Sequence, residues 1–147
     1  MITIDLDSKD LQRGLGQLLQ NATDTRPMMR AIAAEMSSLT EDNFESESWG
    51  GKKWSRSRRT AKNGGKTLQL SGQLAASIST QVGNDFARIG SNKKYAAIHH
   101  LGGQAGKGRK ATIPARPYLP ISGTGQLQPG AERTLVDITL KALKKGV

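Results

Sequence analysis

Thr25-Arg-Pro-Met-Met-Arg-Ala-Ile-Ala-Ala-Glu-Met-Ser-Ser-Leu-Thr-Glu-Asp-Asn-Phe44 is the stretch with the clearest structural signal in this chain of 147 residues. Pro27 fits the first turn of a helix, where a missing backbone N–H costs little. The apolar residues that follow recur at helical spacing: Met28, Met29, Ile32, Ala33, Met36 and Leu39. The pattern predicts a helix that starts after Asp24 or Thr25 and runs to about Phe44, with a long apolar face that other elements must cover.

On its N-terminal side, the chain begins with an alternating segment, Met1–Leu6, which predicts a half-buried strand. Asp7 or Ser8 can then cap a helix that runs to about Asn21. Its leucines stand at helical spacing: Leu11, Leu15, Leu18 and Leu19. We therefore expect a pair of helices in the N-terminal third.

On its C-terminal side, the apolar pattern stops between Glu45 and Lys66, which predicts a long loop over about residues 45–67. Beyond it, Leu68–Ile78 has the spacing of a short amphipathic helix. Thr80–Val82 and Phe86–Ile89 are predicted strands, joined by the turn Gly83-Asn84-Asp85.

The last third begins with a short helix, Lys94–Leu101, which Gly102-Gly103 should end. A glycine-rich basic loop follows over about residues 102–111, with Gln104–Lys110 at its centre. Three prolines make Ile113–Ile121 an edge strand or an extended arm, and Ala131–Lys145 is the final helix. The expected fold is one α+β domain over residues 1–147. In it a small, mostly antiparallel sheet is flanked by the N-terminal helical pair and the C-terminal helix.

Composition narrows the class of protein. Hydrophobic residues make up 35 % and glycines number 17, which is normal for a soluble globular chain. There is no cysteine, so a disulfide framework, a thiolate metal site and a cysteine nucleophile are excluded. The apolar stretches are too short to span a membrane. The acidic first residues are unlike a secretory signal, so we expect a soluble, cytosolic protein with no membrane partner.

Charge is divided unevenly along the chain. Residues 1–48 hold nine acids and four bases, whereas residues 49–147 hold three acids and eighteen bases. Net charge is therefore −5 in the first part and +15 in the second, which together give the overall +10. Such a division suggests contact with a polyanion, or head-to-tail packing of acidic and basic surfaces between copies.

Motifs for catalysis are weak. Gly103-Gln-Ala-Gly-Lys-Gly-Arg-Lys110 lacks the hydroxyl residue of a phosphate-binding loop. His99 and His100 are the only imidazoles, and neighbouring residues of a helix point about 100° apart, so they do not chelate one metal from one face. No nucleophile elbow or carboxylate pair is evident. We expect no enzyme activity, no cofactor and no metal, and a packing role for His99 beside Tyr95.

The basic segment beside Trp49 and Trp54 has two interpretations. Its bases could neutralise phosphates while the tryptophans stack on bases or anchor the loop. Alternatively, Trp54 fills the core and the bases are solvated or face an acidic neighbour. The residues concerned are Lys52, Lys53, Arg56, Arg58, Arg59, Lys62 and Lys66.

Five local patterns, taken in order, resemble one protein family. They are Trp54 with the basic tract after it, Leu68-Gln-Leu-Ser-Gly-Gln-Leu-Ala-Ala-Ser-Ile78, Ala87-Arg-Ile-Gly-Ser-Asn92, Tyr95-Ala-Ala-Ile-His-His-Leu-Gly-Gly103 and Ile113-Pro-Ala-Arg-Pro-Tyr-Leu119. From about Phe44 to Ser122 the chain is similar to the virion-morphogenesis, or tail-completion, proteins of Mu-like tailed bacteriophages and related prophages. It departs from them at Ser55-Arg-Ser-Arg-Arg59, where family members often carry prolines and a leucine.

The resemblance implies a structural protein of the phage neck or tail end, which completes the tail and joins it to the filled head. Such proteins typically act as rings, and six copies would match the tail. The implied partners are further copies and other neck, tail tube or sheath proteins, first in the host cytoplasm and then in the virion. The residues that carry the family pattern are Trp54, Ser71, Gly72, Leu74, Tyr95, His99, Gly102 and Gly103. The alternative is a free basic nucleic-acid-binding protein of the phage.

Two contact surfaces follow as expectations. The seven bases of the 52–66 segment should face a polyanion, either DNA passing through the neck without sequence readout or an acidic surface of a neighbouring protein. The proline arm should project its side chains toward other copies or tail partners, because prolines preset an extended backbone. The arm residues concerned are Arg116, Pro117, Tyr118 and Leu119.

Overall fold

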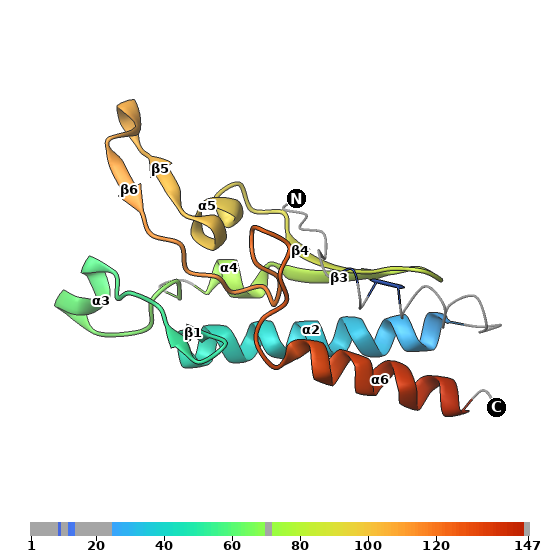
Figure 1. Cartoon of the computed structure of the whole chain (residues 1–147). Helices are drawn as coiled ribbons and strands as arrows, with labels where there is room; N and C mark the ends of the chain where they lie inside the picture. Colours follow the sequence, from blue (N-terminus) through green and yellow to red (C-terminus); the bar gives the residue numbers. More distant parts are fainter. Residues whose placement is uncertain (1–8, 10–11, 14–24, 70–71, 146–147) are drawn as a thin grey trace.

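Helix α2 (Arg26–Ser46) lies in the middle of the molecule, between helix α6 (Ala131–Lys145) on one side and the hairpin of β3 (Ile78–Val82) and β4 (Ala87–Ser91) on the other (Figure 1). The computed structural model describes residues 9, 12–13, 25–69 and 72–145. The predicted strand at residues 1–6 lies outside these residues, as does most of the predicted helix up to Asn21.

Helix α2 confirms the prediction made from its apolar spacing. It begins after Thr25 with Pro27 in its first turn, and it ends at Ser46, followed by the C-cap residue Glu47 with a left-handed φ of 52°. One face of the helix is buried, as the periodicity required. The buried residues are Met28, Met29, Ile32, Ala33, Met36, Thr40, Asn43 and Phe44.

The strands confirm the α+β class and the antiparallel pairing. β3 and β4 pair from Ile78↔Ser91 to Val82↔Ala87. Two further two-stranded sheets stand apart from this hairpin, each paired only within itself: β1 (Ser48–Trp49) with β2 (Lys52–Lys53), and β5 (Gly103–Ala105) with β6 (Ala111–Ile113). The sheet content is therefore divided among three small ribbons.

The segment expected to be a long loop contains elements of its own. After the β1–β2 hairpin comes helix α3 (Arg58–Asn63), whose first turn is capped by the Oγ of Ser57 accepting from the N–H of Thr60 at 3.2 Å. Thr60 is the one buried residue of this helix. Without an apolar face, α3 has no hydrophobic periodicity to reveal it in the sequence.

The helix expected over residues 68–78 is wrong in its length. Only α4 (Gln73–Ala76) is helical among the described residues of that range, and Ile78 already begins β3. Leu68 has a φ of 68°, and Gly72 at the start of α4 has a φ of 72°, so the backbone turns sharply before the helix. Gly72 is the N-cap residue of α4, and Ser71 lies outside the described residues.

The glycine-rich segment forms a ribbon instead of an irregular loop. Helix α5 (Ala96–Leu101) ends at Gly102, as predicted, and the chain then enters β5, the 3₁₀ turn η1 (Lys107–Arg109) and β6. This β5–β6 ribbon extends away from the helices (Figure 1). Gly102 has a φ of 75°, and a Cβ there would stand 2.7 Å from the backbone nitrogen of Ala115, so a side chain does not fit at this junction.

No helix in the described part of the chain is long and apolar enough to cross a membrane. The core lies where α2, α4, α5 and α6 meet the segment after β6. Its main members, besides the buried face of α2, are Trp54, Leu74, Ile89, Ala96, Tyr118, Leu119 and Leu135.

Candidate assembly and polyanion-binding surfaces

The middle of the proline arm, residues 116–120, is largely buried in the molecule. Tyr118 is 0 % exposed, Leu119 is 2 % exposed and Arg116 is 7 % exposed. The expectation that these side chains project from the domain is therefore wrong, and only Pro117 is partly open to solvent. The apolar run Tyr118-Leu119-Pro120 was the signal for burial, whereas the prolines and Arg116 pointed to the surface. A role of the arm in assembly stays a prediction.

His100 holds the arm in place, and the sequence did not reveal this role. Its Nδ1 accepts hydrogen bonds from the backbone N–H groups of Tyr118 at 3.1 Å and Leu119 at 3.3 Å. Its Nε2 lies 2.8 Å from the carbonyl of Ile121, so the ring is neutral with its proton on Nε2. Burial lowers the pKa of His100, which agrees with this neutral form.

Both tryptophans bind the same arm. The indole N–H of Trp54 donates to the carbonyl of Pro117 at 2.8 Å, and that of Trp49 donates to the carbonyl of Leu119 at 2.9 Å. Trp54 is 8 % exposed and meets Phe44 edge-on, with ring centroids 6.0 Å apart. The interpretation in which Trp54 fills the core is confirmed.

His99 packs against Tyr95 as predicted, with ring centroids 5.9 Å apart and nearly perpendicular. Burial, and secondarily the charge of Arg116, lower the pKa of His99. In the described residues, no three side chains among His, Asp and Glu gather as a metal site.

Of the seven bases predicted to face a polyanion, two are bound to the protein surface and five are exposed. Lys66 and Arg59 turn back to the protein: Lys66 pairs with Glu45 at 2.9 Å, and Arg59 donates to the carbonyl of Lys66 at 2.7 Å. Arg56 is exposed, although it also donates to the carbonyl of Thr60 at 3.0 Å. The other four are exposed on β2 and α3: Lys52, Lys53, Arg58 and Lys62.

A basic groove separates α3 from the β5–β6 ribbon. One wall is residues 55–58 and the other is residues 110–114, and the volume between them is about 850 Å³. Its charged lining residues are all basic: Arg56, Arg58, Lys110 and Arg116. The first wall is visible in the sequence as a basic segment, whereas residues 110–116 are brought against it only by the tertiary fold.

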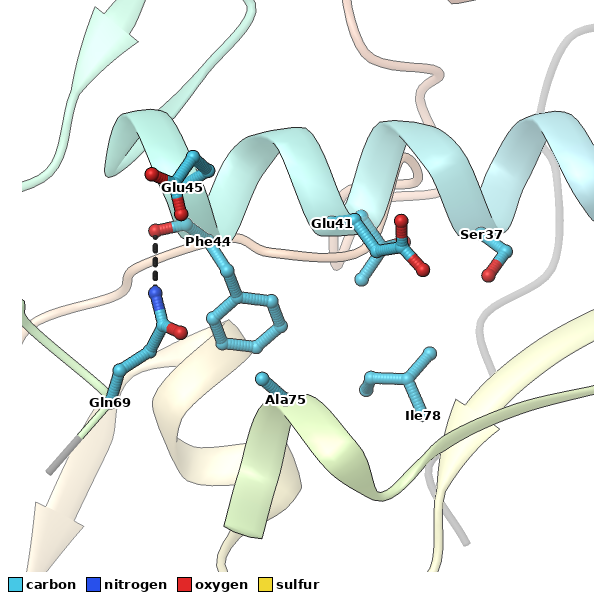
Figure 2. Close-up of a pocket in the computed structure, with 8 residues that line it drawn as sticks. Ser37, Glu41, Phe44, Glu45, Gln69, Ala75 and Ile78 are labelled. Atoms are coloured by element: carbon cyan, nitrogen blue, oxygen red, sulfur yellow. Dashed lines mark hydrogen bonds between the residues drawn. The ribbon is translucent and has the colours of Figure 1, made fainter. Parts of the chain in front are cut away.

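A smaller, acidic pocket lies on α2, facing α4 and the start of β3 (Figure 2). Glu41 and Glu45 stand at its edge, while Phe44 and Ile78 supply apolar surface. Gln69 closes one end by donating to the carbonyl of Phe44 at 2.9 Å. Its volume of about 250 Å³ is below that of usual small-molecule sites. The surface of the protein thus carries separate acidic and basic hollows.

Comparison with known proteins places this architecture in a family. The phage virion morphogenesis family matches residues 6–144. The Mu-like prophage FluMu G protein 2 of Haemophilus influenzae is 38 % identical over 83 % of this chain and 86 % of its own length. Protein G of Escherichia phage Mu, provisionally named for capsid assembly, is 37 % identical over 85 % of this chain and 86 % of its own length.

A third relative, the Mu-like prophage FluMu G protein 1 of Haemophilus influenzae, is 29 % identical over 94 % of this chain and 97 % of its own length. No solved structure matches the chain. The match covers nearly all of the described residues, including α2, the arm and both walls of the basic groove. The chain therefore belongs to the phage virion morphogenesis family.

Proposed function

We propose that this protein is a structural component of the neck or tail end of a tailed bacteriophage. In this role it completes the tail and joins it to the head, as a ring of identical copies, six in number if the ring follows the tail. Membership of the virion morphogenesis family supports a role in particle assembly, and relatives from Mu and Mu-like prophages suggest this type of particle. We propose further copies and neck, tube or sheath proteins as partners. The chain would meet them in the host cytoplasm and remain with them in the virion.

The observation that carries this proposal is the β5–β6 ribbon. Its strands pair over only three residue pairs, and no third strand joins them in the described part of the chain. A two-stranded hairpin on its own is marginally stable in water. An element of this kind, held away from the core, is suited to contact another protein chain, where its open edges and side chains find partners.

A shortened ribbon tests the proposal. Residues 104–112 would be replaced by Asn-Gly, which forms a tight turn between Gly103 and Ile113. The purified variant should keep the melting temperature of the parent because the core residues are untouched. In cells infected with phage lacking the parent gene, the variant should leave filled heads and separate tails in electron micrographs. Joined particles at the normal yield would contradict the assembly role of the ribbon.

The location of the protein tests the proposal independently. Antibody-labelled particles should carry label at the head–tail junction or the tail end, and light scattering of the isolated ring should give a multiple of the 15.8 kDa chain. Label on the capsid shell alone would contradict the neck and tail-end role.

The second candidate function is that of a free, basic nucleic-acid-binding protein, and the basic groove favours it. The names of the family and of the phage Mu relative refer to particle assembly and mention neither a catalytic activity nor a nucleic acid. A monomer that never enters particles but binds DNA at physiological salt would support this candidate over the first.

A further inference from the structure

We propose that the groove between residues 55–58 and 110–116 binds the phosphate backbone of duplex DNA without reading its sequence. This site gives a location and a ligand to the DNA binding named above as the second candidate function, and it goes beyond the assembly role. It concerns binding by the purified chain, whether or not that chain has entered a particle. Three features of the molecule support this site: the charges of the groove, one buried cation and the position of the aromatic residues.

Charge is the first argument. Arg56 and Arg58 come from one wall, Lys110 from the other, and Arg116 from the segment that follows it. No carboxylate lines the groove. Cations that converge from both walls form a channel of one sign, which lowers the cost of holding a phosphate chain. Three of the four are arginines, whose planar fork binds phosphate oxygens in pairs.

The second argument is the buried guanidinium of Arg116. Its Nε donates to the carbonyl of Ser55 at 2.8 Å, and no carboxylate pairs with it among the described residues. Because Arg116 is 7 % exposed, its charge is partly removed from water, and burial lowers its pKa. Lys66, in contrast, is more exposed and has Glu45 as its partner. An anion in the groove would offset the cost of the unpaired charge of Arg116.

The third argument selects a duplex over a single strand. Proteins that bind single strands stack the bases on exposed aromatic rings. No aromatic residue lines this groove, and the nearby indoles of Trp49 and Trp54 are bonded to the arm. The groove therefore offers bases no ring to stack on, while its four cations can bind phosphates, which is the form of contact that duplexes of any sequence share.

Neighbouring bases supply a matched control. Lys52, Lys53 and Lys62 belong to the same basic segment and are exposed, but they do not line the groove. The triple variant Arg56→Gln, Arg58→Gln, Lys110→Gln and the triple variant Lys52→Gln, Lys53→Gln, Lys62→Gln remove the same net charge. Only the first removes it from the groove.

The experiment measures binding of the full chain to a fluorescent duplex of random sequence, by anisotropy at a series of salt concentrations. We expect the groove variant to bind at least about tenfold more weakly, and its slope of log K against log salt to fall by about 0.9 for each phosphate that the variant no longer neutralises. The control variant should change affinity by less than about threefold. Thermal melting of both variants would verify that the overall fold is retained.

Three results would overturn the proposal. Equal losses of affinity in the two variants would show that net charge alone attracts DNA. Tighter binding of a single strand of the same length would contradict the duplex preference. Displacement of the duplex by polyglutamate of equal total charge, with equal potency, would assign the groove to an acidic protein surface. None of these results depends on particle assembly, so the proposed neck role is judged separately by the ribbon variant and by labelling.

Discussion

The backbone N–H of Tyr118 donates a hydrogen bond to Nδ1 of His100 over 3.1 Å, while the two rings meet edge-on with centroids 5.0 Å apart. Through this pair, helix α5 holds the arm that carries Arg116 and leads to α6. Phe44 of α2 stacks on the ring of Tyr118, with centroids 5.1 Å apart. The centre of the molecule is thus a cluster of three rings that hydrogen bonds hold to the arm, and its contribution to stability can be measured by single substitutions.

Replacing His100 by alanine should destabilise the fold strongly. The change leaves the N–H groups of Tyr118 and Leu119 without their acceptor and opens a cavity in the core. We expect a loss of about 2–4 kcal/mol in the free energy of unfolding, measured by urea denaturation. His99→Ala is the matched control, because Nδ1 of His99 has no hydrogen-bond partner among the described residues. This substitution should therefore lower the free energy of unfolding by less. Equal losses would show that the hydrogen bonds of His100 add little.

The stability of the protein should fall as the solution becomes acidic. Burial lowers the pKa of His100 below its usual 6.5, so between that value and the folded pKa the unfolded chain binds more protons than the folded one. The free energy of unfolding should therefore be flat above about pH 7 and should fall below pH 6.5. Each histidine contributes a slope of up to about 1.4 kcal/mol per pH unit.

The variant His100→Gln isolates this proton. The pKa of His99 is lowered as well, so the free energy of unfolding of the variant should still depend on pH. Its slope against pH should be smaller than that of the parent by the contribution of about one proton. Urea denaturation at several pH values gives both slopes. Identical pH profiles for the variant and the parent would show that His100 does not titrate with unfolding.

Substitution of Tyr118 distinguishes a core residue from a surface anchor. Its hydroxyl donates to the carbonyl of Ala96 at 2.6 Å, so Tyr118→Phe should cost about 1–2 kcal/mol by removing this bond. Tyr118→Ala should cost about 3–5 kcal/mol because it also empties the ring position. Calorimetric melting of the monomer provides the comparison. A folded alanine variant with an unchanged melting temperature would contradict the assignment of Tyr118 to the core.

Gly102→Ala should disturb the junction between α5 and the β5–β6 ribbon. The new Cβ would stand 2.7 Å from the backbone nitrogen of Ala115, and the φ of 75° already disfavours a side chain. We expect a loss of about 1–3 kcal/mol. Gly106→Ala has a similar φ of 83°, but its Cβ would meet Ala111 only at 4.0 Å. A difference between the two melting temperatures measures the close approach alone, and no difference would contradict it.

Sequence periodicity predicts those parts of this fold that bury an apolar face. The repeat from Met28 to Leu39 predicts α2 correctly, and alternation with a glycine turn predicts the β3–β4 hairpin. The short elements were missed for a physical reason: α3 buries only Thr60, and the β5–β6 ribbon is stabilised by backbone pairing without apolar repetition. Such elements leave no hydrophobic pattern to read.

The candidate site was only half predictable for a related reason. The basic tract near Arg56 and Arg58 is visible as composition, but its second wall at Lys110 is more than fifty residues away. Arg116 was placed on the surface because a charged residue between prolines usually lies there. Its burial follows from tertiary contacts, chiefly the hydrogen bonds of Trp54 and His100 to the backbone of the arm. The hydroxyl of Tyr118 adds a bond to the carbonyl of Ala96 in α5, and single-residue preferences contain none of these contacts.

The β5–β6 ribbon leaves the outer amides of its strands facing water, and this has a consequence for how assembly can be observed. In the free chain these amides should exchange their protons with solvent far faster than those of α2, since no core must open first. Once a neighbouring chain covers either edge, the exchange rate of these amides should fall. The size of the fall reports the free energy needed to open the new contact. Deuterium uptake over residues 103–113 would therefore report the fraction of copies in a preparation whose ribbon is covered by a neighbouring chain.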